Sequence, residues 1–177
     1  MERLLTEIDS ARQNEALALA VVTSVTRDEA YAVAPGTPLH HHMVLEPKTP
    51  AGLARFAELL ASPDVFAPVI RTAHGYIGAY ALAQRLRDEA GELTGVVELV
   101  HLMVMPEFQR QGVGGRLLRE VESRAGPDAT IRAWVFDCER SAVPFYKREG
   151  YLASDETWDE DLGAMFIAMQ KGEQGSL

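Results

Sequence analysis

The spacing of apolar residues in the first third of the chain favours helices separated by a loop. Residues 2–12 carry Leu4, Leu5 and Ile8 at helical spacing. Residues 15–26 are rich in Ala, Val and Leu, and the secondary structure of this whole N-terminal part, 2–12 included, is ambiguous. Residues 32–50 hold four prolines, which predicts a loop with one short strand around residues 41–45.

A second helix is predicted from its starting residues. Thr49 is a preferred N-cap residue, and Pro50 fits the first helical position. The apolar residues that follow would form one face of this helix: Leu53, Phe56, Leu59 and Leu60.

From Val65 onward the pattern changes to short strands. Residues 65–73, 76–86 and 96–105 read as three strands, joined by a turn at Gly75 and a polar hairpin at 87–95, which predicts an antiparallel meander. A helix at about 112–125, a strand at 130–136, a short helix near 141–149 and a final strand pair around 151–154 and 162–169 follow. We therefore expect an α/β (α+β) fold with a mixed, mostly antiparallel central sheet flanked by helices, and a flexible tail at 171–177.

Length and charge narrow the class of protein. With 177 residues and 47% hydrophobic residues, the chain suits one domain over residues 1–177. A net charge of −9 without a basic run argues against nucleic-acid binding and weakly favours cationic small molecules. Residues 16–25 are too short an apolar stretch to span a membrane, and the acidic N-terminus is unlike a signal peptide, so we expect a cytoplasmic protein without membrane association.

Cysteine and histidine do not suggest a metal site. The single cysteine, Cys138, cannot form an internal disulfide, and no Cys/His spacing fits a zinc site. The consecutive residues His40, His41 and His42 would alternate between the two faces of a strand and cannot converge on one ion. We expect no metal.

The segment 105–118, MPEFQRQGVGGRLL, carries the strongest functional signal. A strand that ends at Pro106 and restarts as a helix after a glycine-rich turn exposes backbone N–H groups at a helix N-terminus, which favours an anion. Gly112, Gly114 and Gly115 let a ligand approach the main chain, and Arg110 adds positive charge. The segment lacks the Lys-Ser/Thr pair of a P-loop and the spacing of a Rossmann fingerprint.

The pattern Gln109-x-x-Gly112-x-Gly114, set between a meander and a helix, resembles the acyl-CoA signature of the GNAT superfamily of N-acyltransferases, and the resemblance covers roughly residues 65–169. It implies acetyl-CoA as co-substrate and a direct acyl transfer to an amine. The pantetheine arm would lie along the backbone of Leu102, Met103 and Val104. The pyrophosphate would bind the amides of Arg110, Gln111, Gly112, Val113, Gly114 and Gly115.

A second segment, SAVPFYKREGY, resembles a later helix of the same family. Tyr146 matches a tyrosine that in the family commonly protonates the departing thiolate; a buried tyrosine that only packs in the core is the alternative. Where many members have an asparagine seven positions earlier, this chain has Glu139, beside Cys138, and an ionised carboxylate cannot donate a hydrogen bond. Glu139 is thus a cofactor-binding candidate that departs from the family pattern.

The base has two candidates on the strand before the glycine motif. Glu98 lies where some family members carry a catalytic glutamate, and an apolar strand would raise its pKa by desolvation. An ordinary paired strand carboxylate is the alternative for Glu98. His101 is the second candidate, with an unperturbed pKa near neutrality, although a structural histidine is the commoner case.

The acceptor is the least determined part. The family grips it with N-terminal helices and the loop between the last two strands, which here would hold Trp158 within an acidic stretch at 154–163. That stretch suits a small cationic amine, or is a solvated turn. A protein lysine or N-terminal acetyltransferase and a non-catalytic acyl-CoA-binding module are the alternatives. Family members often dimerise, so a homodimer is also expected; residues 1–48 exceed the usual family layout and have no assigned role.

Overall fold

The fold is taken from a computed structural model that describes residues 4–30, 47, 49–137 and 141–172. The elements in chain order are β1 (Leu4–Ser10), η1 (Gln13–Glu15), α1 (Ala16–Ala30), α3 (Pro50–Ala61), β2 (Val65–Phe66), β3 (Pro68–Thr72), β4 (Ile77–Arg87), β5 (Leu93–Val104), η4 (Pro106–Phe108), α4 (Val113–Ala125), β6 (Thr130–Phe136), α5 (Ala142–Arg148), β7 (Leu152–Asp159) and β8 (Ala164–Lys171).

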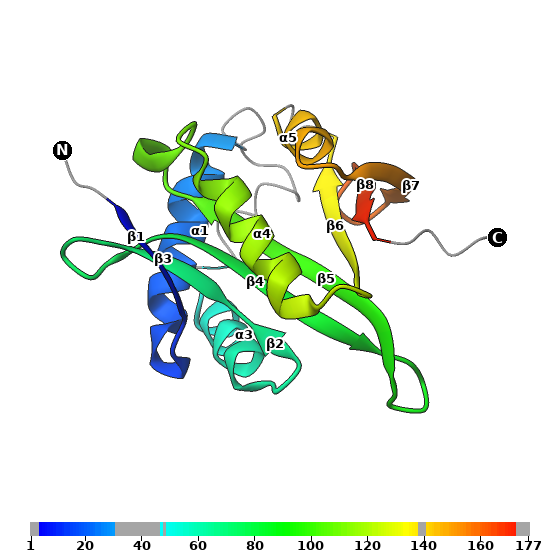
Figure 1. Ribbon diagram of the computed structural model, residues 1–177, viewed down its shortest axis with the longest axis horizontal. Helices are drawn as coiled ribbons and strands as arrows, with labels where there is room; N and C mark the ends of the chain where they lie inside the picture. The colour runs from blue at the N-terminus through cyan, green and yellow to red at the C-terminus, as the bar shows by residue number, and fades with distance from the viewer. Residues whose placement is uncertain (1–3, 31–46, 48, 138–140, 173–177) are drawn as a thin grey trace.

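The strands form one sheet in the order β1-β3-β4-β5-β6-β8-β7, with β2 paired to β4. Among the described strands only β5 and β6 pair in parallel, and every other pair is antiparallel. Figure 1 shows α4 crossing one face of the sheet over β4 and β5, with α1 and α3 on the opposite face. The expected fold class and the antiparallel meander are confirmed.

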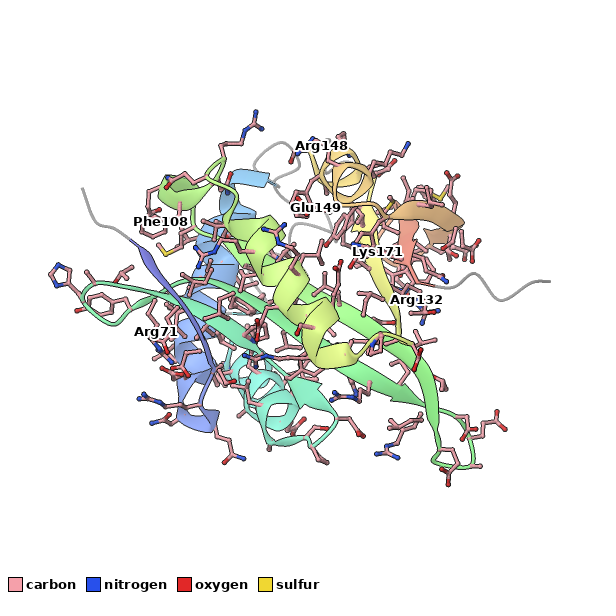
Figure 2. All side chains as sticks on the ribbon, viewed as in Figure 1. Arg71, Phe108, Arg132, Arg148, Glu149 and Lys171 are labelled. Atoms are coloured by element: carbon pink, nitrogen blue, oxygen red, sulfur yellow. The ribbon has the colours of Figure 1, made fainter. Side chains whose placement is uncertain are left out.

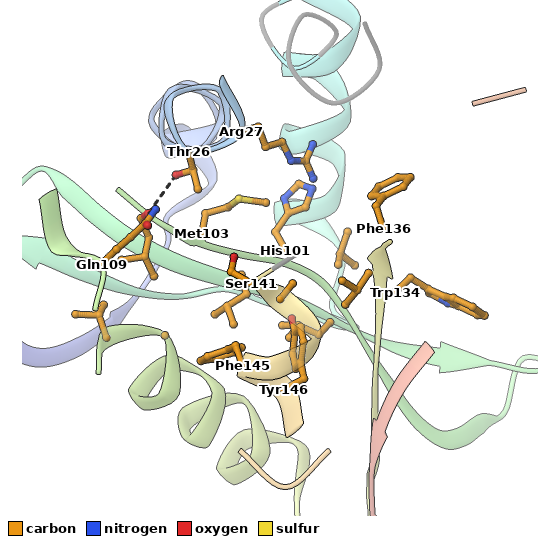
Figure 3. Close-up of a pocket in the computed structure, with 18 of the residues that line it drawn as sticks. Thr26, Arg27, His101, Met103, Gln109, Trp134, Phe136, Ser141, Phe145 and Tyr146 are labelled. Carbon is orange, nitrogen blue, oxygen red and sulfur yellow. Dashed lines mark hydrogen bonds between the residues drawn. The ribbon is translucent and has the colours of Figure 1, made fainter. Parts of the chain in front are cut away.

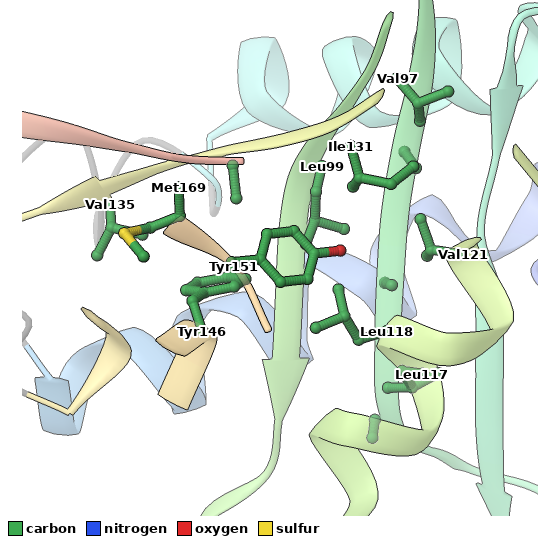
Figure 4. Close-up of a cluster of buried hydrophobic side chains, with 14 of the residues drawn as sticks. Val97, Leu99, Leu117, Leu118, Val121, Ile131, Val135, Tyr146, Tyr151 and Met169 are labelled. Carbon is green, nitrogen blue, oxygen red and sulfur yellow. The ribbon is translucent and has the colours of Figure 1, made fainter. Parts of the chain in front are cut away.

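Strand β4 is buried on both faces, and its sequence reflects the two layers. Ala79, Ala81 and Ala83 face the cluster under α4, while Tyr80 and Leu82 belong to the cluster under α1 and α3. The alanines leave room for the large side chains of α4 that fill that layer, as Figure 4 shows for Leu117, Leu118 and Val121. Residues 77–83 of β4 are therefore covered on both faces of the sheet.

The N-cap prediction for the second helix is confirmed. The Thr49 hydroxyl accepts a hydrogen bond from the Gly52 amide at 3.1 Å, and Pro50 occupies the first helical position of α3. Phe56 is buried under this helix, and Leu53, Leu59 and Leu60 pack against the same cluster.

The helix predicted for residues 2–12 is wrong, because residues 4–10 form strand β1. An isolated helix of this length is marginal in water, whereas a strand gains hydrogen bonds from the edge of β3, with Ile8 opposite Ile70. Arg71 on β3 secures the segment by pairing with Glu15 at 2.7 Å and with Asp9 at 3.3 Å (Figure 2). The hydrogen bond from Arg71 lowers the pKa of Glu15 and keeps it ionised.

The remaining predictions for the two ends of the chain have different outcomes. The ambiguous segment 15–26 lies mostly in helix α1, and the strand expected around residues 41–45 lies outside the described residues. Lys171 is the last residue of β8 instead of the start of a tail; residues 173–177 are outside the description. Its ammonium donates to Glu122 at 2.9 Å and to the carbonyl of Glu149 at 3.0 Å, which ties β8 to α4 and to the residue that follows α5.

Candidate functional site

A cleft opens where β5 and β6 separate. The two strands pair from Val96 opposite Thr130 to Leu99 opposite Ala133, and among the described residues they do not pair beyond that point. The register between β4 and β5 shifts at the same place, so that Val100 forms a bulge. Figure 1 shows β6 diverging from β5. The β6-facing edge of β5 is therefore available to a ligand.

The cleft leads into a cavity of about 1370 Å³ that reaches both sides of the sheet. Its described walls come from α1, α3, β5, the loop before α4, the first turn of α4, β6, α5 and β8. Figure 3 shows part of this lining. The volume exceeds the roughly 300–1,000 Å³ of a typical small-molecule pocket. A long ligand and a second molecule can share it.

The loop before α4 has the conformation of an anion site. Arg110 and Gly112 adopt φ values of 61° and 76°, and the positive φ at Arg110 costs on the order of 1 kcal/mol for a residue other than glycine. The first hydrogen bond into the helix runs from the Arg116 amide to the Gly112 carbonyl at 3.1 Å. The amides of residues 113–115 precede this bond, so the positive end of the helix dipole meets the cavity.

The two glycines in the first turn of α4 differ in the room around them. A Cβ atom on Gly114 would lie 3.4 Å from the Phe145 ring of α5, which is an ordinary contact distance. One on Gly115 would lie 2.7 Å from Oε1 of Glu149, so only glycine leaves this carboxylate in place. The predicted pyrophosphate residues Arg110, Gly112, Val113, Gly114 and Gly115 all line the cavity; Gln111 is not among its lining residues, and its side chain turns back to the Glu107 carbonyl at 3.0 Å.

The cavity is more basic than the chain as a whole. Its described lining holds four arginines, namely Arg27, Arg55, Arg110 and Arg148, against two glutamates, Glu98 and Glu149. The full chain has a net charge of −9. This concentration of guanidinium groups suits a ligand that carries several phosphates.

Leu102, Met103 and Val104, predicted to run beside the pantetheine arm, line the cavity from β5. Leu102 and Val104 face the layer of α4, and Met103 faces that of α1 and α3. The Val104 carbonyl already accepts the Gln109 side-chain amide at 3.0 Å. The side-chain amide of Gln109 thus fastens the loop to the strand.

Glu98, the first candidate base, has a charged partner on the neighbouring strand. Its Oε2 lies 3.2 Å from Nη2 of Arg132, the residue directly opposite it in the β5–β6 register. Its side chain keeps 31% of its exposure and lines the cavity. The apolar surroundings expected from the sequence are therefore replaced by an ion pair in partial contact with solvent.

His101, the second candidate, lines the cavity and is partly buried. Its ring packs against Phe56 at a centroid distance of 5.3 Å, and its Nδ1 is 2.9 Å from the Tyr80 hydroxyl. Burial, together with the nearby Arg27 and Arg55 guanidinium groups, lowers the pKa of His101 well below its ordinary value of 6.5. The imidazole is therefore neutral at pH 7.

Tyr146, the candidate acid, lines the cavity from α5. The residue is 7% exposed, and its ring meets Phe145 and Tyr151 edge-on, at 5.2 Å and 5.4 Å between centroids. Figure 3 shows the rings of Tyr146 and His101 on opposite sides of the cavity. Glu139 and Cys138 lie outside the described residues, so the expectation for Glu139 stays a prediction.

The acidic stretch expected to be a loop is largely a strand. Residues 152–159 form β7, the outermost strand beyond β6 and β8, because Asp155 to Asp159 pair with Ala164 to Ala168. Trp158 is 56% exposed, and none of the acidic side chains in this stretch lines the cavity. The stretch therefore lies away from the cleft.

Four residues of the site were not anticipated from the sequence. Arg27 and Arg55 line the cavity, whereas Thr23 and Tyr80 are hydrogen-bonded to each other, and Tyr80 also to His101. Tyr80 lies in an apolar strand of small residues. A buried tyrosine hydroxyl requires a hydrogen-bond partner, and this requirement was the one signal in the sequence that could have pointed to Tyr80. Its partners are 57 and 21 positions away, so only the fold identifies them.

Within the described part of the chain, no group of three His, Cys, Asp or Glu side chains is placed to hold a metal ion. The helices in those same ranges include none that is both long and apolar enough to cross a bilayer.

Residues 45–172 match the family model described as an acetyltransferase (GNAT) domain. An uncharacterised N-acetyltransferase, YjcF of Bacillus subtilis strain 168, is 30% identical over 87 residues, which is 49% of this chain and 57% of the relative. The matched region thus spans little more than half the length of that curated relative.

Solved structures show the same fold. PaiA N-acetyltransferase from Thermoplasma acidophilum, in complex with coenzyme A, superposes with a TM-score of 0.72 at 18% identity, covering 94% of this chain and 98% of that one. The ribosomal-protein-S18-alanine N-acetyltransferase from Escherichia coli gives a TM-score of 0.66 at 18% identity, covering 97% and 99%.

Proposed function

The chain belongs to the acetyltransferase (GNAT) domain family, and from that premise we propose that it transfers an acetyl group from acetyl-CoA to a primary amine of a small molecule. The observation that carries the proposal is the loop before α4, where positive φ at Arg110 and Gly112 precedes the open amides of a helix N-terminus. This loop lies at one end of the cleft between β5 and β6.

The fit of acetyl-CoA rests on the chain's own donor groups. The amides of residues 112–115 and the Arg110 guanidinium would hold the pyrophosphate, and the unpaired edge of β5 would take the pantetheine arm. The excess of arginine over glutamate along the described lining favours the phosphates. Acetyl-CoA supplies an activated carbonyl in a thioester.

The chain's residues would then move two protons. An amine must lose a proton to become an amide, and the departing sulfur must gain one. Tyr146 is the proposed acid, because its position on α5 places it at the cavity. Glu98 and His101 are the proposed candidates for the base; both lie on β5 and line the same cavity.

The acceptor end of the cavity is bounded by Arg27 on α1 and Arg55 on α3. The acidic stretch that suggested a cationic acceptor lies on β7, outside the cavity. A small amine that also carries a carboxylate therefore suits these walls better than a polyamine does.

The test is thiol release from acetyl-CoA with a polyamine, an amino acid, an amino sugar and a short peptide with free N-terminal and lysine amines. We expect saturable thiol release with at least one small amine, matched by an equal amount of acetylated product, and a higher kcat/KM for the amino acid than for the polyamine. Release with the peptide alone would replace the proposal by a protein acetyltransferase. Binding of acetyl-CoA without release by any amine would leave a binding module.

A further inference from the structure

A chain of hydrogen bonds runs from helix α1 through strand β4 to His101. The Thr23 hydroxyl lies 2.7 Å from the Leu19 carbonyl and also contacts the Tyr80 hydroxyl, which in turn lies 2.9 Å from His101 Nδ1. Thr23 and Tyr80 are both fully buried. The three side chains come from three different elements, so the fold alone brings them together.

The number of hydrogens available fixes the donor and the acceptor of each hydrogen bond in this series. The Leu19 carbonyl can only accept, so the single hydrogen of the Thr23 hydroxyl points to it. Thr23 must then accept from Tyr80, whose only hydroxyl hydrogen is thereby used. Tyr80 can only accept from His101, and Nδ1 must carry the imidazole hydrogen.

The neutral imidazole has one N–H group, so its second nitrogen, Nε2, is left with a free lone pair. Among the described residues none makes a hydrogen bond to Nε2, and Nε2 is not one of the buried atoms without a partner. His101 lines the cavity, so Nε2 is accessible from it.

We propose that Thr23 and Tyr80 are positioning residues that hold His101 in the tautomer with an unprotonated Nε2, and that Nε2 takes the proton from the attacking amine. This inference rests on the proposed acetyl transfer. In the step, the amine nitrogen bonds to the thioester carbon, the carbon–sulfur bond breaks, the amine proton moves to Nε2 and Tyr146 gives its proton to the sulfur. The proton on His101 then returns to Tyr146 through solvent.

The charges around His101 favour its neutral form. Arg27 approaches from α1 and Arg55 from α3, Tyr80 contributes its hydroxyl from β4, and Glu98 lies three positions earlier on β5, bonded to Arg132. Burial of the ring is the main cause that lowers its pKa, and the two nearby cations also oppose a charge on it. The proton-accepting form is therefore populated at neutral pH and is lost only as the pH falls well below 6.5.

The tautomer can be measured without a known acceptor. The chain has five histidines, and protein labelled with ¹⁵N-histidine, compared with His101→Gln, identifies the His101 ring signals by nitrogen NMR. We expect Nδ1 to resonate as a protonated nitrogen and Nε2 as an unprotonated one at pH 7, with Tyr80→Phe giving a mixture of tautomers. Protonation at Nε2, or a doubly protonated ring at pH 7, overturns the inference even if the protein is an active enzyme.

Once the amine panel has identified an acceptor, kcat tests the positioning role of Tyr80 and Thr23. We expect Tyr80→Phe to lower kcat by about 10- to 100-fold with the KM for acetyl-CoA unchanged, and Thr23→Ser to retain the wild-type rate. Wild-type kcat should fall on the acid side only well below pH 6.5, and His101→Gln should remove that dependence.

Tyr151→Phe is the matched control, because it removes another buried tyrosine hydroxyl, one that donates to Glu122 and does not line the cavity. Equal rates for Tyr80→Phe and Tyr151→Phe would overturn the positioning role. A larger loss in Glu98→Gln than in His101→Gln would move the base to Glu98. An inactive wild-type protein would overturn the proposed function, and the NMR measurement would still decide the tautomer.

Discussion

Replacing Tyr146 by phenylalanine is expected to lower kcat about 100-fold, near the low end of the range for loss of a general acid. The low end applies because a thiol with a pKa of roughly 8.5 is a moderate leaving group even without protonation. Acetyl-CoA affinity should change by less than about threefold, because the amides proposed to bind the phosphates lie at Gly112 and in the first turn of α4 and not on α5. Steady-state thiol release and a calorimetric titration measure the two quantities.

The ring of Tyr146 also packs in the core, so the variant needs a stability check. Phenylalanine keeps the ring that meets Phe145 and Tyr151, and the melting temperature should stay within a few degrees of wild type. A fall in kcat of less than threefold, with the fold intact, would show that Tyr146 is only a core aromatic. A fall in acetyl-CoA affinity as large as that in kcat would assign it to binding.

Replacing Leu118 by alanine is expected to destabilise the fold by about 3 kcal/mol, within the range for a buried leucine. Leu118 is fully buried in α4 and packs in the cluster that contains Leu99 and Tyr151 (Figure 4). The loss should lower the melting temperature by about 6–12 °C for a chain of this size. Urea unfolding followed by circular dichroism gives the free energy.

Leu152→Ala is the matched control, since Leu152 is 60% exposed on the edge strand β7. The same substitution there should change the free energy of unfolding by about 0.5 kcal/mol or less. Equal effects at the two positions would contradict the placement of α4 against β4 and β5. Weakened acetyl-CoA binding in Leu118→Ala, at temperatures where it is folded, would show that α4 packing also sets the loop geometry.

Elements determined by local sequence could be predicted. Thr49 and Pro50 start a helix through their own chemistry, and Gly112 permits the positive φ that the loop requires. Strand β1 could not be predicted, because Leu4, Leu5 and Ile8 also satisfy helical spacing. The edge of β3 with which β1 pairs lies some sixty positions later in the sequence. Strand β7 was shortened in the prediction, because its acidic residues resemble a loop until β8 pairs with them.

In the candidate site, too, only the features formed by neighbouring residues in the sequence could be predicted. The glycine loop was predictable, because its residues are contiguous. The partner of Glu98 depends on the register that places Arg132 opposite it, and the environment of His101 depends on Thr23 and Tyr80. Such long-range pairings decide which carboxylate or imidazole can accept a proton, and no local pattern reports them.

Calorimetric titration with acetyl-CoA, on the wild type and on Gly114→Asp, tests the central claim most directly. Aspartate is well tolerated in the first turn of a helix, yet its carboxylate would repel a phosphate there. Gly91→Asp is the control, because it adds the same charge in the distant β4–β5 hairpin. The φ of Gly91 is 85°, which aspartate tolerates better than most residues. We predict saturable binding to the wild type and to Gly91→Asp, and at least about a tenfold loss of affinity in Gly114→Asp. The absence of saturable binding to the wild type, or equal affinity in Gly114→Asp, would contradict an acetyl-CoA site on the loop before α4.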